Sequence, residues 1–269
     1  MKKTQLISNA RKEFLRKTKR ENFTITILRI LIIILFLSIW EICAQFKIID
    51  PFLFSSPTRV IKTLKDLTLT GDLLLHIATT LLETLLGFAI ATLFGTFIAL
   101  LLWLSERARK VLEPYIVTLN ALPKIALGPI IIIAFGAGFK SIVFMTVLVT
   151  VIVTTINMLT GFLQTDKGKI FLLRSMGAKK IQLLVHLIIP NSIPTLISTL
   201  KVNVGLAWIG SIMGEYIVSK QGLGYLIVYG GQVLKLDLVM ASTVILCLLA
   251  GSMYAIVALL ERKITKWQK

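Results

Sequence analysis

Side chains that could carry covalent or metal chemistry are scarce in this chain. Its two histidines, His76 and His186, fall in separate segments that a membrane topology keeps apart, so they cannot share a metal ion. The cysteines Cys43 and Cys247 lie inside apolar runs without metal-ligand spacing, and we interpret both as small apolar side chains. No segment matches the phosphate-binding pattern Gly-x-x-x-x-Gly-Lys-Ser/Thr. We therefore expect neither catalysis nor a bound metal or nucleotide on this chain itself.

The composition indicates a membrane protein. Of 269 residues, 56% are hydrophobic and 16% are charged, whereas soluble domains average about 45–50% apolar and about 25% charged residues. The net charge of +17 would suit a nucleic-acid-binding protein, but that function needs a basic face on a soluble fold. Here the basic residues cluster between apolar runs, so membrane topology explains them and nucleic acid is not an expected partner.

The apolar runs have the length of membrane-spanning helices. A hydrocarbon core of ~30 Å needs about 20 helical residues, and continuous apolar runs exclude the alternating segments of a β-barrel. The sequence therefore predicts an all-α integral membrane protein with about six transmembrane helices. The six stretches are residues 23–44, 73–104, 111–135, 141–163, 193–218 and 238–260.

The distribution of Lys and Arg predicts the orientation. With the N-terminus inside, 20 basic residues fall on the cytoplasmic side and 7 on the other, as the excess of basic residues in cytoplasmic loops requires. We expect a multi-pass protein of the cell membrane with both termini in the cytoplasm. Its parts are a basic tail at 1–22, a transmembrane domain at 23–262 and a short tail at 263–269.

One connection is long enough to have its own function. Residues 164–192 are basic and contain apolar residues spaced mainly by three and four, on both sides of Gly177. This pattern predicts two short helices separated by a glycine turn, with Pro190 and Pro194 at the end of the connection. Long structured connections are more often functional than passive. An amphipathic hairpin lying on the lipid surface is the alternative.

Polar residues within the apolar stretches are further candidates, because a charge at the bilayer centre costs roughly 2.5–3.5 kcal/mol. Lys124 could line a pathway and attract an anion, or it could pair with Glu83. Asn157, Asn203 and Trp208 could line the same pathway. Hydrogen bonding between helices is the other explanation for these three residues.

The long connection resembles the EAA loop of the permease subunits of ATP-binding-cassette (ABC) importers. That loop reads Glu-Ala-Ala, three residues, Gly, nine residues, Ile, one residue, Leu-Pro. In this chain Gly177, Leu187, Ile189 and Pro190 stand in register. The Glu-Ala-Ala positions differ, since they hold Phe171, Leu172 and Leu173.

Other motifs resemble the nitrate, sulfonate and taurine branch of these permeases. In chain order they are Ser56-Pro57-Thr58, His76 with Thr80, Gly87-Phe88, Leu122-Pro123-Lys124-Ile125-Ala126, Gly205-Leu206-Ala207-Trp208, Glu215 and Gly222-Leu223-Gly224-Tyr225. The resemblance runs from about Trp40 to the end of the chain. It implies a type I importer permease fold.

The resemblance also implies a function and partners. The chain would work as a dimer with a second, identical permease subunit. Two ATPase subunits would bind ATP and Mg on the cytoplasmic side. An external binding protein would deliver a small anionic solute such as a sulfonate, taurine or nitrate. A permease for another small solute, such as a vitamin precursor, is the alternative. An ion-coupled secondary transporter would need repeated halves around a midplane site, and the sequence lacks such a repeat.

The resemblance assigns roles to particular residues. The loop at 164–192 would couple ATP hydrolysis to transport through Arg174, Met176, Gly177, Ala178, Lys179, Lys180, Leu187 and Pro190. Arg174, Lys179 and Lys180 would pair with acidic residues of the ATPase. Glu215, Gly222 and Gly224 would shape an external turn that meets the binding protein.

Overall fold

The computed structural model describes residues 2–264, and the side chains from residue 14 onward except those of residues 15 and 22. All regular elements in this described part are helical. The chain divides near residue 63 into two compact units, which are described separately. The first unit holds the N-terminal helix and the second holds the remaining spans.

The first unit is built around one long helix, α1 (Lys2–Gln45), followed by α2 (Pro51–Phe54) and the start of α3 (Pro57–Thr70). The expected basic tail and first span belong to the same continuous helix. The carboxylate of Glu41 accepts the N–H of Thr58 at 3.0 Å and its hydroxyl at 2.9 Å. Glu41 therefore caps the first turn of α3, which explains a charge near the end of an apolar span.

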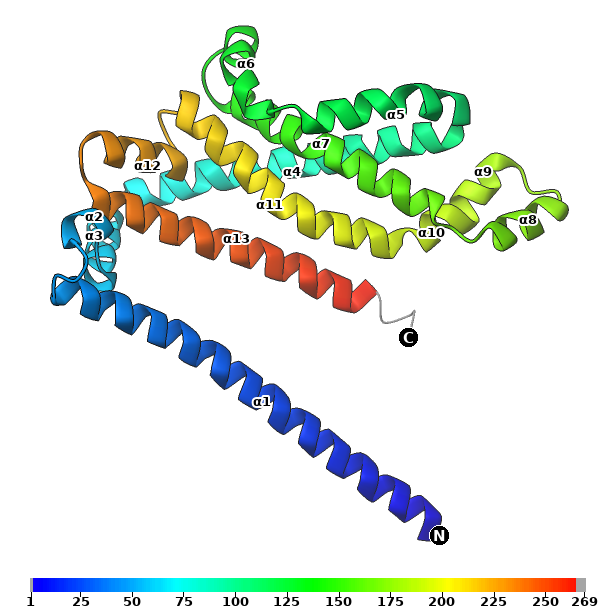
Figure 1. The fold of residues 1–269 in the computed structure, drawn as a ribbon, viewed down its shortest axis with the longest axis horizontal. Helices are drawn as coiled ribbons and strands as arrows, with labels where there is room; N and C mark the ends of the chain where they lie inside the picture. The colour runs from blue at the N-terminus through cyan, green and yellow to red at the C-terminus, as the bar shows by residue number, and fades with distance from the viewer. Residues whose placement is uncertain (1, 265–269) are drawn as a thin grey trace. The chain divides into compact units, whose positions relative to one another are not determined.

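Three helices form the centre of the second unit: α4 (Asp72–Leu104), α7 (Phe139–Leu163) and α11 (Ile193–Val218). Both α4 and α11 pack against α7 (Figure 1). Small residues allow the close contact, since a Cβ on Gly87 would lie 2.4 Å from the Cγ2 of Thr146. On the other side of Thr146, a Cβ on Gly210 would lie 2.6 Å from its Cα. Small residues at helix crossings are the usual basis of packing within membranes.

Two further helices cover this centre. Helix α13 (Leu236–Ile264) packs along α11, and the short helix α12 (Leu223–Gln232) packs against α13 and α11. The Nζ of Lys201 on α11 lies 2.5 Å from the Oε2 of Glu261 on α13. This ion pair compensates two charges that would otherwise be costly near the membrane.

The stretch expected as the third span, residues 111–135, is bent. It consists of α5 (Glu106–Ala121), a 3₁₀ turn at Lys124–Leu127 and α6 (Gly128–Phe135), with a bend of 85° between the two parts. Pro123 has no N–H to donate and keeps the preceding Leu122 extended, at φ −65° and ψ 134°. The described chain thus has five helices able to cross a membrane, or six if the bent pair is one span.

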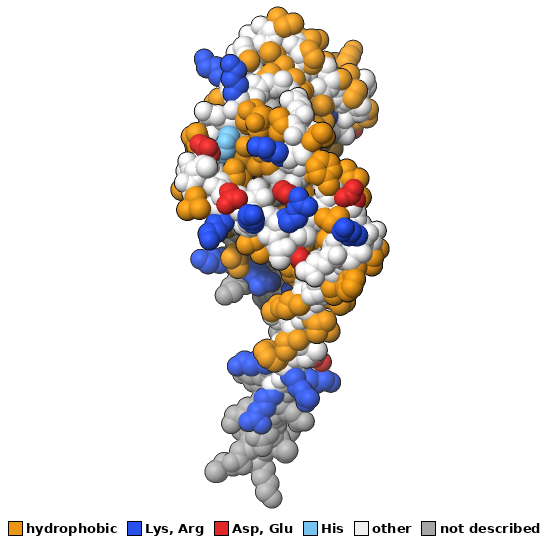
Figure 2. Space-filling view, turned by 90° about the vertical axis from the view of Figure 1, so that its left-hand side faces the viewer, with side chains coloured by type: hydrophobic (Ala, Val, Ile, Leu, Met, Phe, Trp, Pro, Cys, Tyr) orange, Lys and Arg blue, Asp and Glu red, His pale blue; other side chains and the backbone are white. Residues whose placement is uncertain are grey.

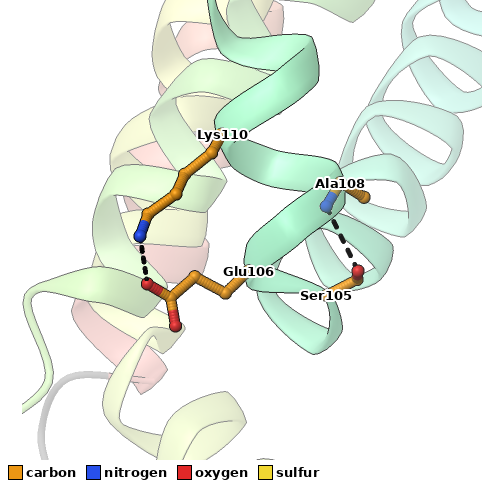
Figure 3. A network of polar contacts seen from close by, with 4 residues as sticks. All are labelled: Ser105, Glu106, Ala108 and Lys110. Atoms are coloured by element: carbon orange, nitrogen blue, oxygen red, sulfur yellow. Dashed lines mark hydrogen bonds and ion pairs between the residues drawn. The ribbon is translucent and has the colours of Figure 1, made fainter.

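Helix α5 has an ordered beginning. The hydroxyl of Ser105 accepts the N–H of Ala108 at 3.2 Å, and Glu106 pairs with Lys110 at 2.9 Å (Figure 3). A serine cap followed by an acidic residue in the first turn is a favourable helix start. The next helix therefore begins directly after α4 ends at Leu104.

The connection between α7 and α11 is helical, as its sequence pattern predicts. It contains α8 (Lys167–Ser175), α9 (Lys180–Leu183), a π-helical segment at Leu184–Ile188 and α10 (Ile189–Asn191). The prediction of two short helices on either side of Gly177 is confirmed. We call residues 164–192 the inter-span loop.

The face drawn in Figure 2 shows side chains of both charge signs among apolar ones. In the second unit, Asp72, Lys140, Lys220 and Lys235 are exposed and lie at helix starts or in turns. Such mixing is expected where a membrane protein meets water rather than lipid tails. The end of the unit opposite α12 carries the inter-span loop (Figure 1).

Candidate functional site

Gly177 ends helix α8 with a defined hydrogen-bond motif. The N–H of Ala178 donates to the carbonyl of Leu173 at 3.0 Å, and the N–H of Gly177 donates to that of Arg174 at 2.9 Å. These two bonds form a Schellman motif, which requires a left-handed residue at the position of Gly177. Its φ is +84°, and a Cβ there would meet no atom within 4 Å. The backbone conformation, rather than lack of space, therefore explains this glycine.

Large apolar side chains are exposed around this turn. Met176 is 75% exposed and Phe171 is 74% exposed. The exposed apolar side chains of the inter-span loop, which we call the loop apolar surface, are Phe171, Leu172, Met176, Ile181 and Val185. A hollow of about 290 Å³ lies beside them, lined by Leu173, Met176, Gly177, Ala178, Gln182 and His186. Several large exposed apolar side chains next to a hollow are typical of a protein-docking site.

Lys180 is engaged within the chain. Its Nζ donates to the carbonyl oxygen of Leu104 at 2.7 Å and lies 6.0 Å from the centre of the Trp103 ring. Leu104 is the last residue of α4, so the ammonium group satisfies a free carbonyl at the negative end of that helix. Lys180 thus contacts α4 within the chain, and Arg174, Lys179 and Lys180 are all exposed, so their pairing with a partner protein stays a prediction.

The end of the inter-span loop is anchored in the protein core. Ile188 is buried and packs with Phe162, Met158 and Leu184. Asn191 donates from Nδ2 to the hydroxyl of buried Thr165 at 3.3 Å, which joins the two ends of the loop. Leu187 and Pro190, two of the expected coupling residues, are half-buried at this anchored end.

Two of the expected pathway residues are interior. Asn203 is 0% exposed, and its Nδ2 donates to Thr92 on α4 at 3.0 Å and to Thr154 on α7 at 2.9 Å. Trp208 is buried in the apolar cluster between α11, α12 and α13. Asn203 therefore bonds three helices together, which is the alternative that the sequence left open, whereas Trp208 contributes apolar packing and its Nε1 has no hydrogen-bond partner among the described residues.

The other two pathway candidates are half-buried. Lys124 donates from Nζ to the carbonyl of Asn120 at 3.0 Å, and this bond, rather than a pair with Glu83, is the one it forms. Asn157 lies in a groove of about 300 Å³ between α7 and α11, which we call the polar groove. The groove is lined by Asn157, Thr160, Gly161, Gln164, Thr195, Ser198, Thr199 and Val202.

The start of α12 is bound by side chains of α4. The N–H of Gly222 donates to Nδ1 of His76 at 2.9 Å, and the N–H of Leu223 donates to the hydroxyl of Thr80 at 2.8 Å. Helix starts leave four N–H groups without partners in the helix. Two of these groups at α12 are therefore satisfied from a different span.

The other two are satisfied from α11. Oε2 of Glu215 accepts the N–H of Gly224 at 2.5 Å and that of Tyr225 at 3.3 Å. A Cβ on Gly222 would lie 2.4 Å from the Glu215 carboxyl, so only glycine fits against it. We call this arrangement of His76, Thr80 and Glu215 around the start of α12 the α12 cap.

The α12 cap changes the interpretation of the residues expected to meet a binding protein. Glu215 is 1% exposed, and Gly222 and Gly224 are buried as well. Buried groups offer no surface to an external protein, so the structure gives these three residues an internal capping role. The sequence contained the signal, since a polar residue in each of two spans and a Gly-x-Gly segment are what a cap of this kind needs.

A second carboxyl lies beside the cap. Glu83 of α4 is 1% exposed and Glu215 of α11 is equally buried. Glu83 also borders a hollow of about 450 Å³ at the α12 end of the unit, together with Gly138, Phe139, Lys220 and Gln221.

The arrangement defines a class of protein before any relative is considered. The described residues form a helical multi-span membrane domain with a structured inter-span loop that exposes apolar side chains. Residues 91–266 match the family model described as binding-protein-dependent transport system inner membrane component. The chain belongs to this family and is an ABC importer permease.

Individual relatives agree with this assignment. The chain is 33% identical over 195 residues to the formylaminopyrimidine transport permease protein ThiX of Halalkalibacterium halodurans, covering 72% of this chain and 77% of ThiX. It is 27% identical over 238 residues to the taurine transport system permease protein TauC of Escherichia coli, covering 86% of each chain. An inward-facing structure of the MetNI methionine ABC transporter matches with a TM-score of 0.66 at 17% identity, covering 73% of this chain and 97% of that one.

Proposed function

We propose that this permease works with separate ATPase subunits that dock on the inter-span loop and carry the ATP and Mg. The loop apolar surface around Met176 is the observation that supports this proposal most directly. In a membrane protein such a surface on a water-facing loop needs a protein partner to cover it. In this proposal the Gly177 turn holds α8 and α9 at a fixed angle. A movement of the loop apolar surface is then transmitted to the buried Ile188 at the end of the loop.

The proposed orientation places the inter-span loop and both termini in the cytoplasm. The excess of Lys and Arg on that side supports it. The α12 end of the unit then faces the exterior, where a binding protein would deliver the solute. A second permease subunit, which we propose to be an identical copy, would complete the pathway.

The proposed solute is a small sulfonate, taurine or a similar oxyanion. The similarity to TauC over 86% of both chains supports this class. A vitamin precursor is the second candidate, because ThiX has the higher identity of the two relatives. ATP-dependent uptake of radiolabelled taurine and of formylaminopyrimidine by proteoliposomes, with the complex and its own binding protein, distinguishes the two.

Co-purification tests the docking of the ATPase. The tagged permease is isolated in a mild detergent from its native cells, and ATPase subunits are identified by mass spectrometry. Met176→Glu places a charge in the loop apolar surface, and Gly177→Arg disrupts the turn, so both should lose the ATPase. Leu69→Glu is the matched control, since Leu69 is 76% exposed at the opposite end of the unit. Recovery of the permease without any ATPase in several detergents would refute the proposal.

A further inference from the structure

The polar groove contains side chains that have no partner in the protein. Within the described residues, the amides of Asn157 and Gln164 and the hydroxyl of Ser198 form no hydrogen bond. The hydroxyl of Thr160 donates to the carbonyl of Ile156 at 2.8 Å, which leaves its lone pairs free toward the groove. The groove therefore presents both donors and acceptors that are unused.

Lipid tails cannot form hydrogen bonds with the polar groups of this surface. Unsatisfied amides and hydroxyls in hydrocarbon cost several kcal/mol each by order of magnitude, because no water is there to bond them. The large exposed side chains elsewhere on α7 and α11 include the apolar Phe144, Leu163 and Ile209, and the exposed Lys140 lies in the first turn of α7. The polar side chains are thus concentrated in one hollow, and a concave polar surface at membrane depth is expected to hold water or solute.

The groove is also free of charge. Its lining combines amides and hydroxyls with Gly161 and Val202, and it includes no Lys, Arg, Asp or Glu. Amide N–H and hydroxyl groups donate well to sulfonate or other oxyanion oxygens. Without a counter-charge they bind weakly, and weak binding lets a solute leave in a transport pathway. A lysine in the same place would hold an anion too strongly for rapid release.

We propose that the polar groove is a solute subsite at the cytoplasmic end of the translocation pathway, where uncharged donors hold an oxyanion-bearing solute shortly before its release. This inference rests on the proposed function, since it takes its orientation and solute class from there. Asn157, Gln164 and Ser198 are the residues expected to contact the solute.

The position of the groove links it to the inter-span loop. Gln164 directly precedes Thr165, which Asn191 bonds across the loop at 3.3 Å. Thr195 lies in the first turn of α11, where the loop ends. Both walls of the groove therefore continue into the loop, and a movement of the loop changes the width of the groove.

Chemical labelling tests whether the groove holds water and solute. Cys43 and Cys247 are replaced by Ser, and Ser198→Cys or the control Leu248→Cys is introduced; Leu248 is an exposed residue of α13. The whole complex in lipid nanodiscs is treated with a water-soluble sulfonated methanethiosulfonate reagent, itself a small oxyanion. We expect the Ser198→Cys variant to react at least tenfold faster than the control, and taurine with the binding protein and ATP to slow the reaction.

Equal, slow reaction of both variants would overturn the proposal, because the groove would then be closed to water. ATPase recovery is measured on the same samples. A complex that keeps its ATPase but shows no labelling refutes the groove alone, whereas loss of the ATPase from the unmodified chain refutes the proposed function.

Uptake measurements give the second test. Asn157→Leu removes two donors and should lower uptake of the solute about tenfold, while the complex keeps its ATPase, and Asn157→Gln should restore most of the uptake. The matched control is Asn120→Leu, an exposed asparagine of α5 outside the groove. Normal uptake in Asn157→Leu would contradict a role for the groove.

Discussion

The Oε2 atom of Glu215 accepts the backbone N–H of Gly224 at 2.5 Å. This bond makes a carboxyl of α11 the cap of α12, and His76 and Thr80 of α4 complete the arrangement. Since α12 depends on groups from two spans, these two spans must stay together at this end for α12 to remain capped. The α12 cap therefore makes one structural body of α12 and the adjoining ends of α4 and α11.

Replacement of Glu215 should loosen this body. Glu215→Ala leaves the N–H groups of Gly224 and Tyr225 without an acceptor inside the protein, at a cost of roughly 1–3 kcal/mol. We expect a lower thermal unfolding temperature for the purified complex, measured by tryptophan fluorescence. The control is Glu106→Ala, which removes an exposed carboxyl that pairs with Lys110 of its own helix, and it should lower the unfolding temperature clearly less. An equal effect of both variants would contradict the capping role.

Gly222 should tolerate no side chain. Its φ of +111° strains any other residue, and a Cβ would lie 2.4 Å from the Glu215 carboxyl. Gly222→Ala is therefore expected to destabilise the protein by at least about 1–2 kcal/mol from the backbone alone. Gly231→Ala serves as the control, since a Cβ at Gly231 meets no atom within 4 Å and its φ is ordinary. The measurement is the same thermal unfolding; equal stability of the two variants would argue against the close contact.

Much of this fold could be predicted from the sequence, because the length of an apolar run and the charge of a loop are local features of the chain. The spans at 73–104, 141–163 and 193–218 lie within one residue or two of the helices observed. Pro123 marks the position of the bend in the sequence. The angle of 85° depends also on packing against α7, which the sequence does not show. Continuity of α1 through the expected tail has no signal in the apolar pattern, since charged residues extend a helix as readily as apolar ones.

The site residues were predictable to a lesser degree. The turn at Gly177 could be predicted locally, because a glycine between two amphipathic patterns commonly ends a helix. The role of Glu215 depended on which residues of α4 and α12 it meets, and residues more than a hundred positions apart, such as His76 and Gly222, are brought together only by helix packing. Lys180 illustrates the same limit, because its acceptor on Leu104 belongs to another span.

Asn203 should matter for stability. Its amide joins Thr92 and Thr154, and measured hydrogen bonds between membrane helices contribute about 0.6 kcal/mol on average and at most about 1.7. Asn203→Ala removes both bonds and leaves a small cavity, so we expect a loss of roughly 1–3 kcal/mol. Unfolding by a denaturing detergent measures this loss, with Asn120→Ala as the exposed control. A stable Asn203→Ala protein with altered solute preference would instead support a role for Asn203 in lining the translocation pathway.

The turn at Gly177 should respond to conformation rather than to size. Asn adopts a left-handed backbone more readily than Ala does, and the position has room for either side chain. We expect Gly177→Asn to retain most ATPase co-purification and Gly177→Ala to lose part of it, in line with a strain of about 1 kcal/mol. The amount of ATPase recovered per permease is the measurement, and a larger loss with Asn than with Ala would show that side-chain volume matters instead.

The two lysines that follow this turn should have separable effects. Lys180 binds the end of α4 through the Leu104 carbonyl, whereas Lys179 is exposed and free to meet an acidic partner surface. Lys180→Met should therefore lower the thermal stability of the permease alone, by roughly 0.3–1 kcal/mol. Lys179→Met should leave that stability unchanged and make the binding of the ATPase less sensitive to salt, because one exposed charge pair is removed. Titration of NaCl from low to high concentration during co-purification measures this sensitivity, and an unchanged salt response in Lys179→Met would place the electrostatic contact elsewhere on the loop.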